Sequence, residues 1–587
     1  MSGAVPRDNR MDGVLRPDVL IIGAGPAGLA AARAALRRGA SVTLLDAADS
    51  LGGQYWRHLP ETRRAAREEI LHHGWATYRR LVCELRDAPR CEIILGAQVW
   101  ALESGRRGDG ETTESTDRQD PRDGTAIASP APSVPLTVHA LIGPPDGTGR
   151  KPRTIQPRTL VLATGAHDRT LPFPGWDLPG VFTAGAAQAY AKGERVAVGR
   201  RVVVAGAGPF LLPVASSLVS TGATVLGVYE ASTPRQMIRG WLSKPWQLAG
   251  AAHKSGELAG YIRGQLRHRV PYRTGYAVVA AHGEDRVAAV TVARVDAQWA
   301  PIPGTARRIE ADAVCVSHGF TPRLELAIAA GCALSPDRFV VVDADQRTSV
   351  PGVFAAGEIT RIGGVDAALA EGELAGHAAA GGCSADAAVV TARRSATVFT
   401  GFAARIEAAH GIQPGWTAWL TEDTIVCRCE EVTYGRFCST LAATGGPSLR
   451  SLRMTTRAGL GVCQARVCGR TVEDLLIGEP TVGVAEVDID HTRISLPAPV
   501  PVAVSDRRPI TTPVRLAELA AMPPSPSARP SVPSARPSVP SAAPSVPSAA
   551  PSVPSAAPSV PSGSTPRRSD PTPRSPTGPS GQPATST

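Results

Sequence analysis

DVLIIGAGPAGLAAARAALRRGASVTLLD, residues Asp18–Asp46, is the stretch that decides the fold. Its four apolar residues Val19–Ile22 predict a short buried strand, and a glycine-rich turn follows directly. The Ala/Leu-rich segment 29–38 predicts a helix, and a second apolar strand at 42–45 ends on Asp46. The order of strand, glycine turn, helix, strand and acid predicts a dinucleotide-binding βαβ unit.

Each position of this unit has a physical role in holding a dinucleotide. Gly23 permits the tight turn, Gly25 lets a pyrophosphate approach the backbone, and Gly28 lets the helix pack close to the strand. The helix N-terminus offers free N–H groups to the phosphates. Asp46 can accept hydrogen bonds from a ribose 2′-hydroxyl, which favours FAD or NAD over NADP. A glycine-rich turn without a ligand would not explain Asp46. The turn is completed by Pro26 and Ala27.

Composition bears on several classes of function. The 587 residues are 43% hydrophobic and 19% charged, as in globular proteins, and the length predicts about three or four domains. The net charge is +10, but the tail from Pro523 holds five Arg and one Asp. Because no basic stripe is interleaved with aromatic residues, we expect no nucleic-acid partner. Without an apolar run of about 18 residues or an apolar signal core, we expect a cytoplasmic protein with no membrane span and no disulfide framework among its ten cysteines.

The opening pattern recurs at residues 201–230, again as strand, glycine turn, helix and strand with a terminal acid. The copy is imperfect, because Leu211 stands where the third glycine belongs. A leucine there pushes the helix from the strand and obstructs a pyrophosphate. The second site would therefore bind nicotinamide poorly, bind a different nucleotide, or be a structural relic. The residues of this degenerate site are Gly206, Gly208 and Glu230.

Four of the ten cysteines form two close pairs late in the chain. Cys427 and Cys429 are spaced CxC, 33 residues follow, and Cys463 and Cys468 are spaced CxxxxC. Four thiolates in a reducing compartment indicate a metal site. Structural zinc usually shows CxxC knuckles, whereas this spacing resembles the bacterioferritin-associated-ferredoxin (BFD) type of [2Fe–2S] domain, and four cysteines match a two-iron cluster. Zinc and a module without metal are the alternatives. Cys438 lies outside both pairs and is expected in the core.

From Asp18 to about Ala521 the chain resembles the FAD- and [2Fe–2S]-containing subunits of hetero-oligomeric amino-acid dehydrogenases. Opine oxidase A subunits, cyanide synthase B subunits and D-hydroxyproline dehydrogenase alpha subunits belong to this group. The matching stretches are GAGPAGL, GGQ, ATG, GAGP with its failing third glycine, AAGE and CRCEEVT…TRAGLGVCQARVCG. The resemblance implies an α/β flavoprotein with two dinucleotide-binding domains, glutathione-reductase-like, followed by a BFD-like [2Fe–2S] domain and a disordered tail.

The same resemblance assigns further residues to FAD. A Gly-Gly pair after the opening unit lets the backbone approach the flavin side, and an ATG element closes the FAD domain. In the returning segment an acid binds the ribityl or pyrophosphate region, and the N-terminus of a helix at 367–380 faces the isoalloxazine. Glu358 replaces the commoner Asp in that segment but keeps the acceptor. The residues implied to contact FAD beyond the opening unit are Gly53, Gln54, Ala163, Thr164, Gly165, Gly357, Glu358 and Gly364.

The domain organisation follows from these motifs. Residues 104–135 are polar without a hydrophobic period and are predicted as a disordered insertion, and the charged segment 61–86 predicts a solvent-facing helix. Proline recurs through the last residues, which excludes a coiled coil and predicts an extended tail. The expected parts are an N-terminal extension 1–17, a split FAD-binding domain 18–195 and 312–400, a second nucleotide-binding domain 196–311, a [2Fe–2S] domain 401–521 and a tail 522–587.

The expected function is a flavin dehydrogenase subunit that passes electrons to a one-electron acceptor through the cluster. By resemblance the substrate is an amino acid or secondary amine, oxidised by a second, D-amino-acid-oxidase-like flavoprotein subunit, and a small ferredoxin-like subunit is a further partner. No residue presents itself as a general base, which agrees with a relay role. The main alternative is an NAD(P)H-dependent reductase of flavin and a ferredoxin-type cluster. Another is an iron–sulfur module with a vestigial flavin domain.

Overall fold

The computed structural model describes residues 10–520, with gaps at 12–13, 64, 66, 105–135, 146, 244–249, 252, 445–447, 479–504, 506–507 and 509. The described residues belong to one compact unit, Met1–Pro524. The predicted disordered insertion, apart from Ser104, lies outside the described residues. The same holds for the tail 522–587 and for residues 1–9 of the predicted N-terminal extension.

A five-stranded parallel sheet carries the opening unit, with strand order β20-β9-β3-β4-β5. Every residue of β3 and β4 is buried, because helices cover one face of this sheet and strands of a mixed sheet, together with residues 324–330, cover the other. The strands come from distant parts of the chain, so the sheet is complete only when the strand that begins at Val353 pairs at its edge. Their bounds are β3 (Val19–Ile22), β4 (Val42–Leu45), β5 (Cys91–Ile94), β9 (Thr159–Leu162) and β20 (Val353–Ala355).

Helices α1 (Pro26–Arg37) and α8 (Gly364–Ala379) pack closely through small residues. A Cβ atom on Gly372 would lie 2.1 Å from the carbonyl oxygen of Ala27, and one on Gly376 would lie 2.0 Å from that of Ala31. Only glycine therefore allows this approach. Both helices begin about three residues earlier than the sequence predicts.

The prediction of one helix over 61–86 is wrong in its first half. Helix α2 begins only at Trp75 and ends at Arg86, and residues before it form two short 3₁₀ turns, η1 (Glu61–Arg63) and η2 (Glu68–Ile70). Gly74 adopts a left-handed conformation with φ of 67°. The His72 ring nitrogens lie 2.5 Å and 2.8 Å from the carbonyl oxygens of Arg57 and Glu68. These tertiary contacts override the helical propensity of a charged segment.

A second parallel sheet, β11-β18-β12-β13-β14, carries the second glycine motif, and the antiparallel sheet β15-β16-β17 lies against it. The prediction of two Rossmann-like parallel sheets is thus confirmed. The strand bounds are β11 (Val181–Thr183), β12 (Arg201–Gly206), β13 (Thr224–Glu230), β14 (Tyr272–Thr274), β15 (Tyr276–His282), β16 (Ala289–Arg294), β17 (Arg307–Glu310) and β18 (Ala313–Ser317). The helices beside β12 are α3 (Ala184–Gly193) and α4 (Leu211–Ser220).

A further five-stranded sheet is mixed and has the order β1-β2-β8-β7-β6. Strands β6 and β7 pair antiparallel as far as Ser104 opposite Leu136, so the insertion joins the two ends of a hairpin. Strand β2 pairs with β8, which brings part of the predicted N-terminal extension into the sheet. The bounds are β1 (Arg10–Met11), β2 (Val14–Leu15), β6 (Ala97–Ser104), β7 (Leu136–Ile142) and β8 (Lys151–Ile155).

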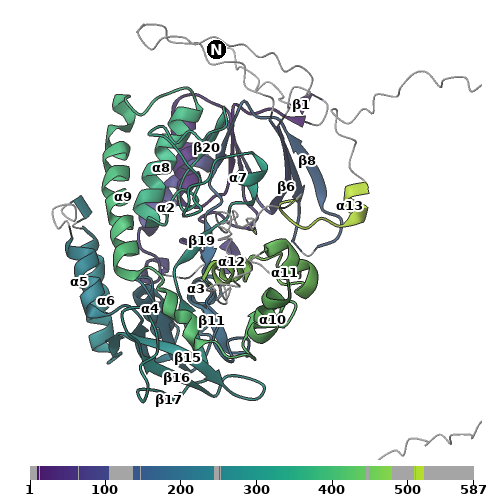
Figure 1. The fold of residues 1–587 in the computed structure, drawn as a ribbon. Helices are drawn as coiled ribbons and strands as arrows, with labels where there is room; N and C mark the ends of the chain where they lie inside the picture. The colour runs from purple at the N-terminus through teal and green to yellow at the C-terminus, as the bar shows by residue number, and fades with distance from the viewer. Residues whose placement is uncertain are drawn as a thin grey trace, which may run out of the picture. The chain divides into compact units, whose positions relative to one another are not determined.

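Helix α9 (Val390–His410) packs on α8 from one side and on α5 (Pro234–Leu242) from the other (Figure 1). Helix α6 (His253–Arg267) contacts α4. Short elements complete this part of the fold: the two-stranded sheet of β10 (Ala166–Asp168) and β19 (Phe320–Pro322), helix α7 (Glu325–Ala329) and the 3₁₀ turn η4 (Ala387–Val389). No helix in the described part of the chain has the length and apolar character needed to cross a bilayer.

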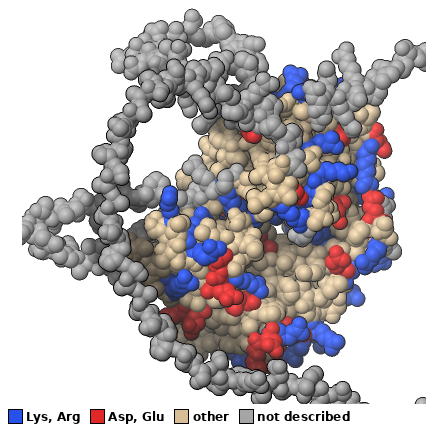
Figure 2. All heavy atoms as spheres, turned by 90° about the vertical axis from the view of Figure 1, so that its right-hand side faces the viewer, with Lys and Arg blue, Asp and Glu red and all other residues tan. Residues whose placement is uncertain are grey.

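The cysteine-bearing C-terminal module shares one hydrophobic core with the second sheet and the antiparallel sheet beside it. Trp176 donates its indole N–H to the carbonyl of Ile425 at 2.6 Å, and the Trp419 ring stacks on that of Trp299 with centroids 6.3 Å apart. Figure 2 shows basic and acidic side chains intermingled on the side of the molecule that carries α10, α11 and α13 in Figure 1. The bounds are η5 (Pro414–Trp419), β21 (Ile425–Cys427), β22 (Val432–Thr433), α10 (Tyr434–Thr444), α11 (Leu449–Thr456), α12 (Gly469–Gly478) and α13 (Leu516–Ala520).

Candidate functional site

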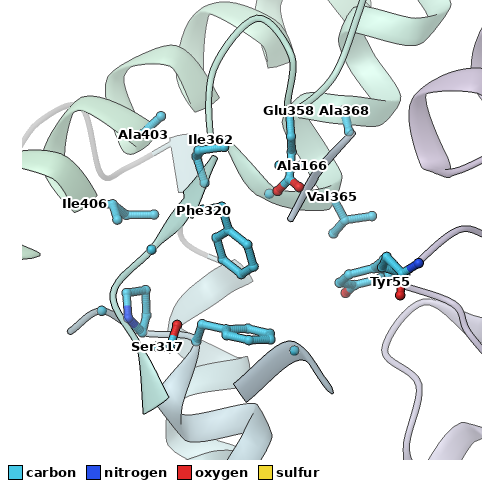
Figure 3. A pocket seen from close by; sticks show the side chains of 18 of the residues that line it. Tyr55, Ala166, Ser317, Phe320, Glu358, Ile362, Val365, Ala368, Ala403 and Ile406 are labelled. Carbon is cyan, nitrogen blue, oxygen red and sulfur yellow. The ribbon is translucent and has the colours of Figure 1, made fainter. Parts of the chain in front are cut away.

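A cavity of about 2130 Å³ lies where both glycine motifs end. Figure 3 shows the side chains of Tyr55, Phe320 and Glu358 pointing into the same space. Residues of α5 and α6 also line the cavity, so these two helices cover part of the site. The predicted FAD residues that line it are Gly23, Gly25, Pro26, Ala27, Asp46, Gly53, Gln54, Ala163, Thr164, Gly165, Gly357, Glu358 and Gly364. Gly28 lies behind them, in the packing of α1.

The glycines of the first motif are required by their surroundings. A Cβ on Gly23, which has φ of 107°, would lie 2.2 Å from the carbonyl oxygen of Ala163, and one on Gly28 would lie 1.7 Å from that of Gly23. Gly25 differs, because its Cβ would have no atom nearer than the Cα of Gly53 at 4.0 Å. Space is therefore left at Gly25 on the side of the cavity.

Asp46 is held in place at the end of β4. The backbone N–H of Ala24 donates to its Oδ2 at 2.5 Å, and that of Ala48 donates to its Oδ1 at 2.8 Å. Burial raises the pKa of Asp46, although these hydrogen bonds oppose the rise. Each carboxylate oxygen keeps a lone pair for a further donor, such as a ribose hydroxyl.

Two helix N-termini open onto the cavity. The N-cap residue of α1 is Gly25 and that of α8 is Gly363, and neither makes a side-chain capping hydrogen bond. The first N–H groups of both helices are therefore available to an anionic ligand, with the partial positive charge of the helix dipole behind them.

Two neighbouring carboxyl groups belong to Glu358, which precedes α8, and to Glu371, which lies within it. Glu371 accepts hydrogen bonds from the backbone N–H of Gly357 at 2.9 Å and from Thr360 Oγ1 at 2.8 Å, and pairs with Arg361 Nε at 2.9 Å. Glu358 faces the cavity instead. Burial, together with the negative charge of Glu371, raises the pKa of Glu358 to about 7.

A pH titration of stability tests this assignment. A glutamate whose folded pKa is raised from 4.5 to about 7 favours the fold in its protonated form, so its stabilisation is present below pH 4.5 and is lost as the pH rises to 7. Denaturant unfolding of the flavin-free E358Q variant should therefore show a smaller loss of stability over this interval than the wild type. Equal slopes for the two proteins would contradict the raised pKa.

The second glycine motif does not reproduce the first. Helix α4 begins at Leu211, the sixth position of its motif, whereas α1 begins at Pro26, the fourth. Leu211 is fully buried in the core beside β12, so the turn Gly206–Phe210 stays outside the helix. The free N–H groups of a first helical turn are thus displaced by two residues, as expected of a degenerate site.

The acid of the second motif, Glu230, already makes hydrogen bonds with other residues of this chain. Glu230 is fully buried and accepts hydrogen bonds from the backbone N–H of Gly208 at 2.9 Å and from the Tyr272 hydroxyl at 3.1 Å. His410, the last residue of α9, places Nδ1 3.4 Å from Glu230 Oε1. Trp241 donates its indole N–H to His410 Nε2 at 3.1 Å, so Nδ1 carries the proton that points at Glu230. Gly208 lines the cavity, whereas Gly206 and Glu230 do not.

The sequence did not single out His410 or Lys192. Lys192, on α3, is buried, donates to the carbonyl of Tyr55 at 2.9 Å and lies 5.3 Å from the centre of the Tyr55 ring. Burial lowers the pKa of Lys192 to about 8. The only sequence feature that could have indicated Lys192 is its position as a lysine within an alanine-rich helix. No local feature indicates His410, because its partner Glu230 is 180 residues away in the sequence.

The four paired cysteines lie in one chain of contacts. Cys427 Sγ and Cys468 Sγ are 3.6 Å apart, Cys468 also interacts with Cys463, and Cys463 interacts with Cys429. The Cys468 thiol donates to Cys427, and the interactions of Cys468 with Cys427 and Cys463 lower the pKa of those two thiols and raise that of Cys468. Within the described residues, no group of three or more histidine, cysteine, aspartate or glutamate side chains is arranged to hold a single metal ion.

The backbone around these cysteines is unusual. Four of the non-glycine residues with positive φ lie in the cysteine loops, and such conformations concentrate at functional sites. The backbone N–H of Gly459 lies 3.3 Å from Cys427 Sγ, and a Cβ on Gly461 would lie 2.4 Å from Cys429 Cβ. Two arginines near the cysteine pairs form ion pairs with glutamates, Arg457 with Glu430 and Arg466 with Glu325. The positive-φ residues are Glu431, Arg457, Gln464 and Ala465.

Comparison with known proteins places this fold and site in context. Residues 17–372 match the family model described as pyridine nucleotide-disulphide oxidoreductase. The chain is 31% identical over 530 residues to the A-type subunit of opine oxidase from Agrobacterium tumefaciens (strain Ach5), covering 86% of this chain and 92% of that protein. It is 30% identical over 472 residues to hydrogen cyanide synthase subunit HcnB of Pseudomonas aeruginosa, covering 77% and 91%. A solved L-proline dehydrogenase from P. horikoshii shares the fold, with a TM-score of 0.53 and 20% identity over 86% of this chain and 79% of that chain.

Proposed function

Because this chain belongs to the pyridine nucleotide-disulphide oxidoreductase family and is an FAD-dependent oxidoreductase, we propose that it is the flavin- and cluster-bearing component of an amino-acid or secondary-amine dehydrogenase complex. Its role is to relay electrons from FAD to a one-electron acceptor through a [2Fe–2S] cluster. The relatives from opine oxidase and hydrogen cyanide synthase support the amine class of substrate.

The residues of the first motif fit FAD. The uncapped N-terminus of α1 and the open side of Gly25 would hold the pyrophosphate, and Asp46 would accept from a ribose hydroxyl. Glu358 and the N-terminus of α8 would lie along the ribityl and flavin part. When bound, FAD supplies two-electron chemistry that can be discharged one electron at a time. The chain contributes binding, orientation and exclusion of water.

The observation that carries the proposal is the contact series of Cys427, Cys468, Cys463 and Cys429. A two-iron cluster takes four thiolates as two pairs, each pair on a different iron, so the ligands need not surround one centre. The close approach of Cys429 that Gly461 permits and the N–H of Gly459 directed at Cys427 fit such a group. Helix α12 begins directly after Cys468, and its N-terminus favours negative charge there.

Two features favour a relay over an NAD(P)H-dependent reductase. The acid of the second motif is engaged by His410 and Tyr272, which leaves it closed to a nicotinamide ribose. In addition, no cysteine lines the cavity in the described part of the chain, so a flavin-adjacent redox disulfide is not formed by those residues. Oxidation of the amine would then take place on a second, D-amino-acid-oxidase-like subunit. A small ferredoxin-like protein is a further partner in this proposal.

Optical spectra and rapid mixing test the function. The purified chain should show flavin absorption together with the broad visible absorption of an iron–sulfur cluster, and equal amounts of iron and acid-labile sulfide. Anaerobic mixing with NADH or NADPH should leave the flavin oxidised. Rapid bleaching would overturn the relay in favour of the reductase, and a protein without flavin peaks would favour an iron–sulfur module with a vestigial flavin domain.

A further inference from the structure

The cavity wall and the cysteine loop are joined by one short segment. Strand β10 follows directly on the predicted FAD residues Ala163–Gly165, and Ala166 and His167 both line the cavity. His167 also makes a contact outside the cavity. Its Nε2 lies 2.8 Å from the carbonyl oxygen of Arg466, a residue between Cys463 and Cys468. A carbonyl only accepts, so Nε2 carries the proton and donates it.

The cysteine loop is also fixed by residues that follow β10. Thr170 donates its hydroxyl to the carbonyl of Val467 at 2.8 Å, and Thr471 donates to the carbonyl of Thr170 at 2.6 Å. Arg169 pairs with Asp474 of α12. Thr170 is buried and does not line the cavity, whereas His167 does. Several contacts therefore hold the loop, but among these residues only His167 both lines the cavity and bonds the segment between the two cysteines.

We propose that His167 couples the FAD cavity to the cysteine loop, and that electrons leave the cavity along Ala166–His167 and the hydrogen bond to Arg466. The inference rests on the proposed function, since it presupposes a cluster on these cysteines. His167 is a positioning residue, because it touches the loop backbone and not the reacting sulfur atoms. Partners in the second layer around metal ligands orient those ligands and tune the centre.

The proposed electron transfer also requires a one-electron acceptor. With both groups bound, each passage would take one electron from the reduced FAD and give one electron to the cluster, and the proton released from the flavin would pass to the solvent. Two passages complete the oxidation of a two-electron carrier. Between them a one-electron acceptor protein must reoxidise the cluster.

Flash photoreduction tests the coupling in the full-length protein with its FAD and cluster. Under anaerobic conditions, light with EDTA as the sacrificial donor reduces the flavin, and cluster reduction is followed by visible absorbance and by EPR of freeze-quenched samples. H167L and H167F remove the donor, H167Q keeps an N–H donor, and T170V removes a hydrogen bond to the same loop away from the cavity. The EPR line shape of the reduced cluster and hydrogen exchange over residues 465–470 show whether the loop itself has changed.

We expect H167L and H167F to slow flavin-to-cluster transfer roughly 10- to 100-fold, while H167Q recovers most of the rate and T170V stays near wild type. The EPR line shape should be the same in all variants. Wild-type rates in H167L and H167F would overturn the inference, as would an equal slowing in T170V, which would reduce His167 to one anchor among several. A wild-type chain without a cluster would instead overturn the proposed function and, with it, the coupling.

Discussion

The G25A variant should lose most of its affinity for FAD while its flavin-free form remains as stable as the wild type. Gly25 has φ of −72° and ψ of −175°, which alanine adopts without strain, and the added Cβ would meet nothing nearer than 4.0 Å. The methyl group points instead to where a pyrophosphate would meet the start of α1. Losing two charge-assisted hydrogen bonds of about 1.5–3 kcal/mol each predicts a fall in affinity of roughly hundredfold or more.

Flavin fluorescence titration of the flavin-free protein measures this affinity, and denaturant unfolding should place its stability within about 1 kcal/mol of wild type. The contrasting variant is G28A. Its Cβ would lie 1.7 Å from the carbonyl oxygen of Gly23, so the clash is internal and the fold itself should lose about 1–3 kcal/mol. Wild-type FAD affinity in G25A would show that no pyrophosphate lies against this residue.

The opening unit could be predicted because its chemistry is local. The tight turn at Gly23, with φ of 107°, and the close helix at Gly28 are demands of a βαβ unit on its own backbone. A residue pattern within one such unit therefore carries enough information to place strand, turn, helix and acid. For the same reason Leu211 marked the second motif as different, and in the structure α4 begins two motif positions late.

What could not be predicted depends on contacts between distant segments. The sequence does not show that His410 contacts Glu230, since the two residues are 180 positions apart and His410 lies at the end of α9, outside both glycine motifs. The segment 61–74 likewise has the composition of an exposed helix. It is held instead by tertiary contacts, including the partly buried ion pair between Glu68 and Arg195. The link from His167 to Arg466 spans 299 residues and has no local signature.

The C463A variant should lose the iron–sulfur cluster and keep FAD. Cys463 and Cys468 flank one tight loop whose residues Gln464 and Ala465 have positive φ, and Cys463 contacts both Cys468 and Cys429. Removing one of four thiolates leaves an iron with an incomplete ligand set. We expect loss of iron, sulfide and the EPR signal of the reduced protein, with unchanged flavin absorption.

The matched control is C438A. Cys438 lies on α10, close in sequence to the first pair but outside both spacings, and packs against the same core. This variant should keep its iron, which separates the ligand role of a cysteine from its role as a small apolar side chain. Iron loss in C438A would assign it as a ligand, and full iron content in C463A would remove Cys463 from the set. A colourless zinc site would appear in elemental analysis as zinc in the wild type.

Because metal binding to such a module stabilises its fold, C463A should also unfold at a lower temperature than C438A, and this difference should vanish once iron is removed from C438A.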